Sequence, residues 1–173
     1  MVDSQFQYPV DKHLQHLVGK TKRDINKMHI EIDQSGKVEQ LNKDTYIAFS
    51  NHEQYCVKLP KNIKQEIVYE YRTKVRQLIQ KLFAVCVFYC LKDYIGKKEM
   101  ITIDLEYPGW EDFIKRELAA SIKTIHVNFD NKIIRFGQIT KESKAHKLAL
   151  RTFREEEKPN RILTKNEVLK WLK

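Results

Sequence analysis

The sequence predicts an α/β fold with one mixed sheet of five or six strands and helices on both faces. Segments with strand-like alternation fill residues 28–59, and the turns between them are only a few residues long, so neighbouring strands must pair antiparallel. Apolar residues then recur at helical spacing from residue 63 to residue 89. Later strands alternate with helices, which requires parallel crossover connections. The expected sheet is therefore an antiparallel meander followed by parallel strands.

The length and composition of the chain are those of one folded domain. Its 173 residues are 42% apolar and include only 5 Gly and 4 Pro, which is enough for a core and too few chain breakers for disorder. We divide the sequence into a basic N-terminal extension at residues 1–27, an α/β domain at 28–157 and a C-terminal docking helix at 158–173.

An excess of positive charge favours a polyanion as partner. Lys and Arg number 32 against 23 Asp and Glu, which gives a net charge of +9. Nucleic acid is the first candidate and an anionic membrane surface the second. A Lys-rich solvated surface is the plainer explanation of the same charge.

The sequence predicts neither membrane insertion nor secretion. The longest apolar run, residues 83–91, is far shorter than the roughly 20 residues of a membrane-spanning helix. The N-terminus lacks a basic region followed by an apolar one. Cys56, Cys86 and Cys90 have no metal-ligand spacing and suit buried thiols in a reducing compartment. We therefore expect a cytoplasmic protein with no membrane partner.

The meander begins with an alternating strand that ends in an acid. Ile30 and Ile32 share one side of this strand, and Asp33 falls on the other, polar side. Ser35 and Gly36 then favour a tight turn. Further short strands are expected at residues 37–41, 45–50 and 55–59.

A single long helix is expected from Pro60 to near Gly96. Pro is well tolerated at a helix start, where its missing N–H costs little. The apolar seam fits packing against the sheet, and it also fits a two-stranded coiled coil that would make the protein a homodimer. Residues 83–91 are apolar on all sides, which favours burial of that half within a domain.

The second half of the chain alternates between strands and helices. Polar and apolar residues alternate at 101–105, Pro108 and Gly109 end that strand, and a helix follows at 110–122. A strand at residues 124–129, a hairpin-type turn at 130–131 and a strand at 133–139 are expected next.

Two helices complete the expected fold. The first begins near Lys141 or Ser143 and has an apolar side along its length. Thr164 and Glu167 then have the spacing of a capping box for a last short helix.

Two acids near strand ends suggest a metal site. Asp33 and Asp104 both fall on the polar side of their strands, so their carboxylates meet if the strands are adjacent and parallel. Paired carboxylates repel unless a cation or a shared proton joins them. Mg²⁺ or Mn²⁺ takes such ligands, and two ions about 3.5–4 Å apart can clamp a phosphodiester. Glu66, or Glu70 one turn on, would supply a third ligand, and Glu106, about 6–7 Å beyond Asp104 along the strand, is the alternative.

Each of these acids also has a plainer explanation. Asp33 stands before Gln-Ser-Gly and suits a turn former. Asp104 suits a solvent-facing carboxylate, and Glu66 suits a complement to the helix dipole. The sequence contains no Gly-rich phosphate loop, no G-x-S-x-G motif and no Cys/His zinc spacing, which disfavours nucleoside triphosphate hydrolysis and serine hydrolase chemistry.

The order of these elements resembles the ribonuclease H-like superfamily. The resemblance is carried by IEIDQSGKVEQ, an antiparallel meander, a helix bearing a Glu, a strand ending in Asp, and a late helix with SKAHKLA. It covers roughly residues 28–154, and the superfamily includes ribonucleases H, Holliday-junction resolvases and integrase-type nucleases. The resemblance implies that Asp33, Glu66 and Asp104 match its acidic positions. His146 matches the last position, which is His in some resolvases and nucleases.

Our leading hypothesis from the sequence is a divalent-metal-dependent nuclease that acts on DNA, RNA or a hybrid. His146 would assist as a general base, a metal ligand or a product-release group. The basic residues expected to follow substrate phosphates are Lys141, Lys144, Lys147 and Arg151. One rival is a non-catalytic nucleic-acid-binding or assembly module with the same sheet and charge. Another is an adaptor that dimerises through the long helix.

Overall fold

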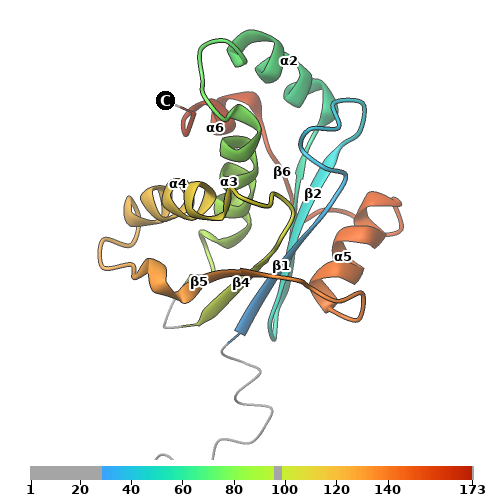
Figure 1. Ribbon diagram of the computed structural model, residues 1–173. Coiled ribbons are helices and arrows are strands. Elements are labelled where there is room, and N and C mark those ends of the chain that lie inside the picture. The colour runs from blue at the N-terminus through green and yellow to red at the C-terminus, as the bar shows by residue number, and fades with distance from the viewer. Residues whose placement is uncertain (1–28, 96–98, 173) are drawn as a thin grey trace, which may run out of the picture.

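The computed structural model describes residues 29–95 and 99–172, which form an α/β fold around one mixed sheet. The strands are β1 (His29–Ser35), β2 (Thr45–Ser50), β3 (Gln54–Leu59), β4 (Met100–Asp104), β5 (Ile134–Gly137) and β6 (Arg161–Ile162). The helices are α2 (Lys61–Tyr71), α3 (Leu78–Leu91), α4 (Glu111–Lys123), α5 (Lys144–Phe153) and α6 (Lys165–Leu169), with a 3-10 turn η1 (Asn131–Ile133). The predicted fold class is confirmed (Figure 1).

The sheet has the strand order β5-β4-β1-β2-β3-β6. β1, β2 and β3 pair antiparallel as the expected meander. β4 joins the other side of β1 in parallel, and β5 joins β4 in parallel. The predicted adjacency of the first strand and the 101–105 strand is therefore confirmed, and it places β1 and β4 side by side at the middle of the sheet.

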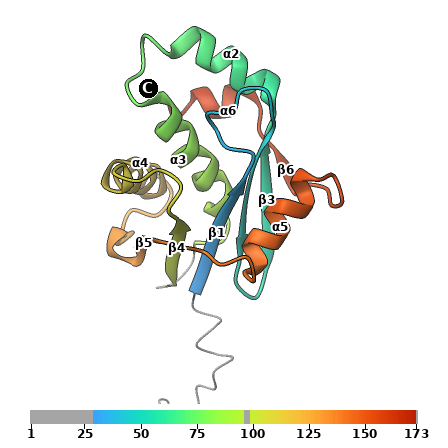
Figure 2. The ribbon, with the colours of Figure 1, turned by 45° about the vertical axis from the view of Figure 1, so that its right-hand side comes forward.

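Helices cover the two faces of the sheet unequally. α3 and α4 lie on one face and α5 lies on the other (Figure 2). Under α3 and α4, the isoleucines of β1 and β4 are at most 1% exposed and belong to the main hydrophobic core; they are Ile30, Ile32, Ile101 and Ile103. Under α5 a smaller core gathers Tyr46, Ala48, Cys56, Leu148 and Ala149.

The expected single helix from Pro60 is instead two helices. α2 ends at Tyr71, α3 begins at Leu78, and Gln77 between them has a φ of 48° in the left-handed region. Residues 72–77 contain neither Gly nor Pro, so the sequence gives no signal for a break there. The apolar spacing therefore predicted one continuous helix. Residues 82–91 are buried inside the chain, as their all-round apolar character predicted. That half of the proposed coiled-coil seam is therefore occupied within the protomer.

The expected strand at residues 37–41 is absent, and turns fill residues 37–44. A buried lysine anchors this loop, because the Lys64 ammonium donates to the carbonyls of Lys37 (3.2 Å) and Gln40 (2.8 Å) and to Thr45 Oγ1 (2.8 Å). Burial lowers the pKa of Lys64 to about 8. Lys64 thus fixes the loop that follows β1 to helix α2.

The predicted strand at residues 124–129 and the hairpin turn after it are also wrong. Residues 124–129 form turns, and η1 follows them. The Asp130 carboxylate accepts from the backbone N–H of Lys132 at 2.9 Å and caps this 3-10 turn. β5 then pairs parallel with β4, so no hairpin precedes it.

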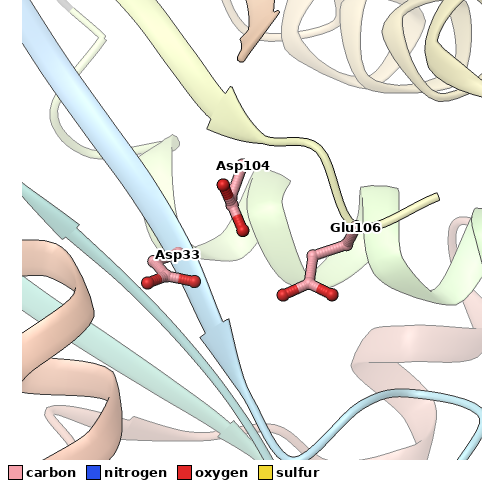
Figure 3. A group of neighbouring side chains, drawn as sticks. All are labelled: Asp33, Asp104 and Glu106. Carbon is pink, nitrogen blue, oxygen red and sulfur yellow. The ribbon is translucent and has the colours of Figure 1, made fainter. Parts of the chain in front are cut away.

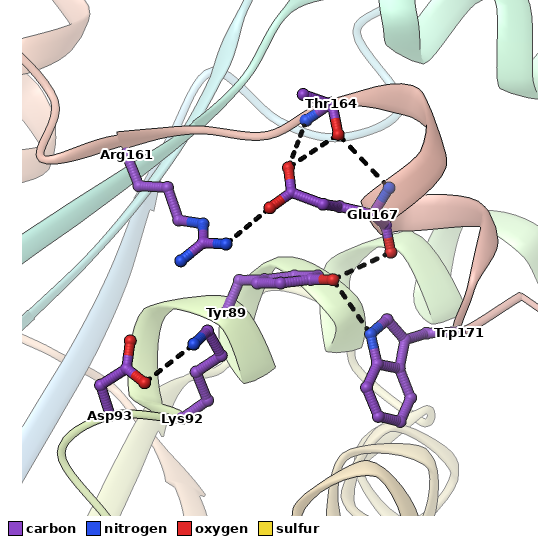
Figure 4. A network of polar contacts seen from close by, with 7 residues as sticks. All are labelled: Tyr89, Lys92, Asp93, Arg161, Thr164, Glu167 and Trp171. Carbon is purple, nitrogen blue, oxygen red and sulfur yellow. Dashed lines mark hydrogen bonds and ion pairs between the residues drawn. The ribbon is translucent and has the colours of Figure 1, made fainter.

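The C-terminal segment packs against the body of the fold (Figure 4). The capping box is confirmed, with Thr164 and Glu167 bonded reciprocally at the start of α6. The Tyr89 hydroxyl of α3 donates to the Glu167 carbonyl at 3.0 Å, and Trp171 Nε1 donates to the Tyr89 hydroxyl at 3.1 Å. The two-residue strand β6, which the sequence did not predict, pairs with β3.

Two further expectations concern the N-terminus and the membrane. The N-terminal extension at residues 1–27 lies outside the described residues. Within the part of the chain that the structure describes, no helix combines the length and apolar character needed to cross a bilayer.

Candidate metal centre

Three carboxylates meet where β1 and β4 end. In the parallel register Ile32 lies opposite Ile103, so Asp33 and Asp104 follow at the same level of adjacent strands. Glu106 stands just beyond β4 and turns back toward them (Figure 3). One carboxylate oxygen from each of the three residues lies within 4.8 Å of the others. Both predicted aspartates are therefore neighbours, with Glu106 as the third acid.

The backbone near the strand ends brings Glu106 and Lys37 together. The Glu106 N–H donates to the Asp104 carbonyl at 2.9 Å, which bends the chain as it leaves β4. Gly36 has a φ of 69°, and a Cβ there would lie 2.1 Å from the Asp44 carbonyl oxygen, so this turn requires glycine. The turn places Lys37 Nζ 3.1 Å from Glu106 Oε2.

Asp33 is the most buried of the three acids, at 4% exposure. Its Oδ1 accepts from the Gln34 N–H at 2.6 Å, and its Oδ2 lies 2.6 Å from His146 Nδ1. Burial raises the pKa of Asp33 and the negative charge of Asp104 adds to this rise, while the hydrogen bonds from Gln34 and His146 oppose it. The carboxylate is thus held in one orientation in a place that disfavours its charge.

Glu106 has a similar conflict. Burial raises the pKa of its carboxyl, Lys37 opposes this rise, and the charges of Asp104 and Asp33 reinforce it. In return, Glu106 raises the pKa of Lys37. Burial and the neighbouring carboxylates thus both disfavour the charged forms of Asp33 and Glu106, and a cation beside them would favour those forms.

His146 reaches Asp33 because the start of α5 is tied to β1. The Ser143 hydroxyl caps the helix by accepting from the Ala145 N–H at 3.1 Å, and it donates to Glu31 Oε2 at 2.7 Å. Glu31 lies two residues before Asp33 on β1, so the bond sets the helix against the strand next to the acids. The His146 side chain is 28% exposed, which leaves its ring accessible beside the cluster.

The carboxylates retain capacity for a metal ion. Asp104 Oδ1 accepts from the Ile139 N–H at 2.7 Å, which steadies it without using its second oxygen. An ionised carboxylate offers about four lone-pair positions on its two oxygens. Even Asp33, with both oxygens engaged, has lone pairs left. The donor set is all oxygen, which suits a hard divalent cation such as Mg²⁺ or Mn²⁺.

The helix glutamates expected as third ligands lie elsewhere. Glu66 and Glu70 on α2 face Lys165 of α6, with Nζ–Oε2 distances of 3.4 Å and 3.1 Å. Neither residue joins the acidic cluster. The reason is that α2 packs against α6 and stands beyond the 37–44 loop, so its acids serve that contact. Glu106, the alternative from the sequence, occupies the third position.

The basic residues predicted to contact phosphates are exposed on and beside α5. Lys147 pairs with Glu142 at 2.8 Å, and Arg151 pairs with Glu157 at 2.9 Å. Lys141 and Lys144 make no ion pair with the described residues. Two of the four predicted charges are thus partly balanced by neighbouring acids.

Sequence reasoning missed Lys37, Glu31 and Ser143. Glu31 shares the strand parity of Asp33, so alternation alone places it on the same face. Ser143 had the signal of a helix cap. Lys37 had no signal, because its position depends on the loop that Lys64 anchors.

Comparison of this chain with protein-family models, with curated proteins and with solved structures gave no match.

Proposed function

We propose that this protein is a divalent-metal-dependent nuclease of the ribonuclease H-like type, which cleaves a structured or hybrid nucleic acid. The observation that carries the proposal is the cluster of Asp33, Asp104 and Glu106 at the ends of two adjacent parallel strands, with one oxygen of each within 4.8 Å of the others. The net charge of +9 supports a substrate with a phosphate backbone.

The acids of the cluster and Lys37 have different roles in this proposal. Asp33, Asp104 and Glu106 would hold Mg²⁺ or Mn²⁺, and the bound ion would act as a Lewis acid and lower the pKa of a coordinated water. In hydrolysis the water oxygen forms a bond to phosphorus, and one P–O ester bond breaks. Lys37 keeps the Glu106 carboxylate oriented from the opposite side.

His146 has two functions in this proposal. Its Nδ1 contacts Asp33 Oδ2 and fixes the orientation of that carboxylate. Its Nε2 is then the nitrogen that accepts or returns a proton during hydrolysis. The second function makes His146 a proton carrier beside the reacting phosphate.

The test is cleavage of labelled duplex DNA, an RNA–DNA hybrid, a four-way junction and a single strand in Mg²⁺ or Mn²⁺. We expect Asp104→Asn to reduce the cleavage rate by about 10²–10³-fold or more, since metal stabilisation of the transition state is worth several kcal/mol. Nucleic-acid retention should be nearly unchanged.

A matched pair of variants sharpens the test. Glu106→Gln and Glu66→Gln remove the same charge from the same residue type, inside and outside the cluster respectively. Only Glu106→Gln should slow cleavage. If the wild type binds these substrates and cuts none of them, the non-catalytic binding module replaces the nuclease as the function.

A further inference from the structure

The face of the sheet that carries the acids is only partly covered. α5 packs against β1, β2 and β3. On the same face, the described part of the chain places no helix over β4 and β5 (Figure 1). Polar side chains therefore line a strip next to the candidate metal centre, where Arg135 is exposed and Thr102 is 9% exposed. The segment that joins β5 to α5 borders this strip, and its Ile139 N–H bonds to Asp104 Oδ1.

Arg135 is the cationic side chain of this strip. It lies opposite Thr102 in the β4–β5 register, and its Nε donates to Thr102 Oγ1 at 2.9 Å. His29 Nε2 lies 2.6 Å from the same oxygen. Arg135 is exposed, and within the described residues no carboxylate lies at ion-pair distance from its guanidinium. A planar guanidinium without a carboxylate partner suits a phosphate.

Gly137 leaves the space between Arg135 and the acids free of a side chain. It lies opposite Asp104 in the register, on the same face as Arg135, and two residues along a strand span about 6–7 Å. A Cβ at Gly137 would meet only Thr102 Cγ2, at 3.7 Å, which is ordinary contact. Packing therefore does not require glycine here, whereas a long side chain would stand next to Asp104.

We propose that the phosphate backbone of the substrate crosses β5, and that Arg135 binds the phosphate next to the one that the ion at the carboxylates would contact. The nucleic-acid strand then passes over Gly137 to reach Asp104. This inference rests on the proposed function, since it takes a nucleic acid as the ligand. It identifies the edge of the sheet from which the substrate enters.

The first experiment compares two arginines. The Kd of a fluorescein-labelled duplex and of a labelled hybrid is measured by anisotropy in metal-free buffer, over a series of salt concentrations, for wild type, Arg135→Gln and Arg116→Gln. Arg116 lies on α4, which covers the other face, and it is 68% exposed and pairs with Glu117 at 3.4 Å. Its replacement removes the same unit of charge from the side of the sheet away from the acids. We expect Arg135→Gln to raise Kd about tenfold and to reduce the salt slope by about 1. Arg116→Gln should change Kd by less than about twofold.

The second experiment tests the path over Gly137. Gly137→Ala adds only a Cβ, which fits, so it should slow cleavage less than a long side chain does. Gly137→Gln should slow cleavage about tenfold or more while thermal melting stays within a few degrees of wild type. These variants keep the proposal testable if Arg135→Gln does not fold.

The outcomes separate this inference from the nuclease proposal. If the wild type cuts its substrate and Arg135→Gln and Arg116→Gln raise Kd equally, the proposed path over β5 is overturned and the nuclease proposal stands. If the wild type cuts nothing, but Arg135→Gln weakens binding and Arg116→Gln does not, the proposed path is supported and the nuclease proposal is overturned. A wild type that binds neither probe, and that cuts none of the four substrates named above, overturns both proposals.

Discussion

The two faces of the β1–β4 pair contrast sharply, although the same strands build both. Ile32 and Ile103 point into the core under α3 and α4 and are fully buried. The next residues, Asp33 and Asp104, point to the opposite face and meet as carboxylates. Because alternate residues of a strand face opposite sides, one step along the chain separates the residues that stabilise the fold from those that carry charge.

The contrast is energetic as well as chemical. Burial of apolar surface contributes roughly 25 cal/mol per Å² to stability. Burial of a carboxylate opposes its charged form, and here it raises the pKa of both Asp33 and Glu106. The apolar face thus stabilises the fold, whereas burial on the acidic face disfavours the charged forms of Asp33 and Glu106.

The largest expected effect on stability comes from comparing one substitution on each face at two neighbouring positions. Ile103→Ala should lower the free energy of unfolding by about 2–5 kcal/mol, as for other buried large-to-small changes. Asp104→Asn, one residue on, should change it by less than about 1 kcal/mol. Urea unfolding followed by circular dichroism measures both. A large loss in Asp104→Asn would mean that the acid is structural, against our assignment.

The next effect is stabilisation by metal. If Mn²⁺ binds the folded cluster as proposed, Mn²⁺ at about 100 times its Kd should raise the free energy of unfolding by about 2.7 kcal/mol. For a chain of this size that corresponds to a melting temperature higher by about 5–10 °C. Glu66→Gln should keep the shift and Asp104→Asn should lose most of it. An equal shift in all three proteins would place the ion elsewhere.

A smaller effect is the dependence of stability on pH. The pKa of Asp33 is raised in the folded state, so the native protein binds this proton more tightly than the unfolded chain does. The free energy of unfolding must therefore fall as pH rises from the ordinary value of 3.8 through the folded pKa. Without metal, Asp33→Asn should gain melting temperature over wild type across that window and keep the gain above it. No gain would mean that the hydrogen bonds from Gln34 and His146 outweigh burial.

The smallest effect concerns an exception on the apolar side. Gln34 shares the strand parity of Ile32, is 7% exposed, and neither Oε1 nor Nε2 has a hydrogen-bond partner among the described residues. Gln34→Met should therefore raise the free energy of unfolding by about 1 kcal/mol, since it removes an unsatisfied buried amide. Chemical denaturation measures this change. A loss instead would show that the amide is hydrogen-bonded to solvent.

Local patterns predicted β1, β4 and the side that their two aspartates occupy. The alternation around Ile32 and Ile103 determined which side each aspartate occupies, and the element order required parallel neighbours. The third acid could not be chosen from sequence, because Glu66 and Glu106 differ only in what their elements pack against. Lys165 lies about a hundred positions from Glu66, and no local pattern predicts that pair.

The errors in the predicted fold also occur where local sequence patterns do not report long-range contacts. The break at Gln77 has no Gly or Pro to mark it, so helical periodicity continued through it. Residues 124–129 alternate like a strand, yet β5 takes the place beside β4 and leaves them as turns. β6 is two residues long, too short for periodicity to detect. Only at residues 124–129 did the pairing of β5 with β4 override a local tendency; the break at Gln77 and the strand β6 had no local signal.

The late strand β6 has a consequence for synthesis on the ribosome. It covers one edge of β3, and the Cys56 N–H also bonds to Asn160 Oδ1, 104 positions later, at 2.7 Å. A nascent chain that has not yet released residues 160–162 therefore presents β3 as an unpaired edge, which is a template for aggregation between chains. Once residues 160–162 have left the ribosome that edge can close, so solubility during translation depends on a contact of very high sequence separation.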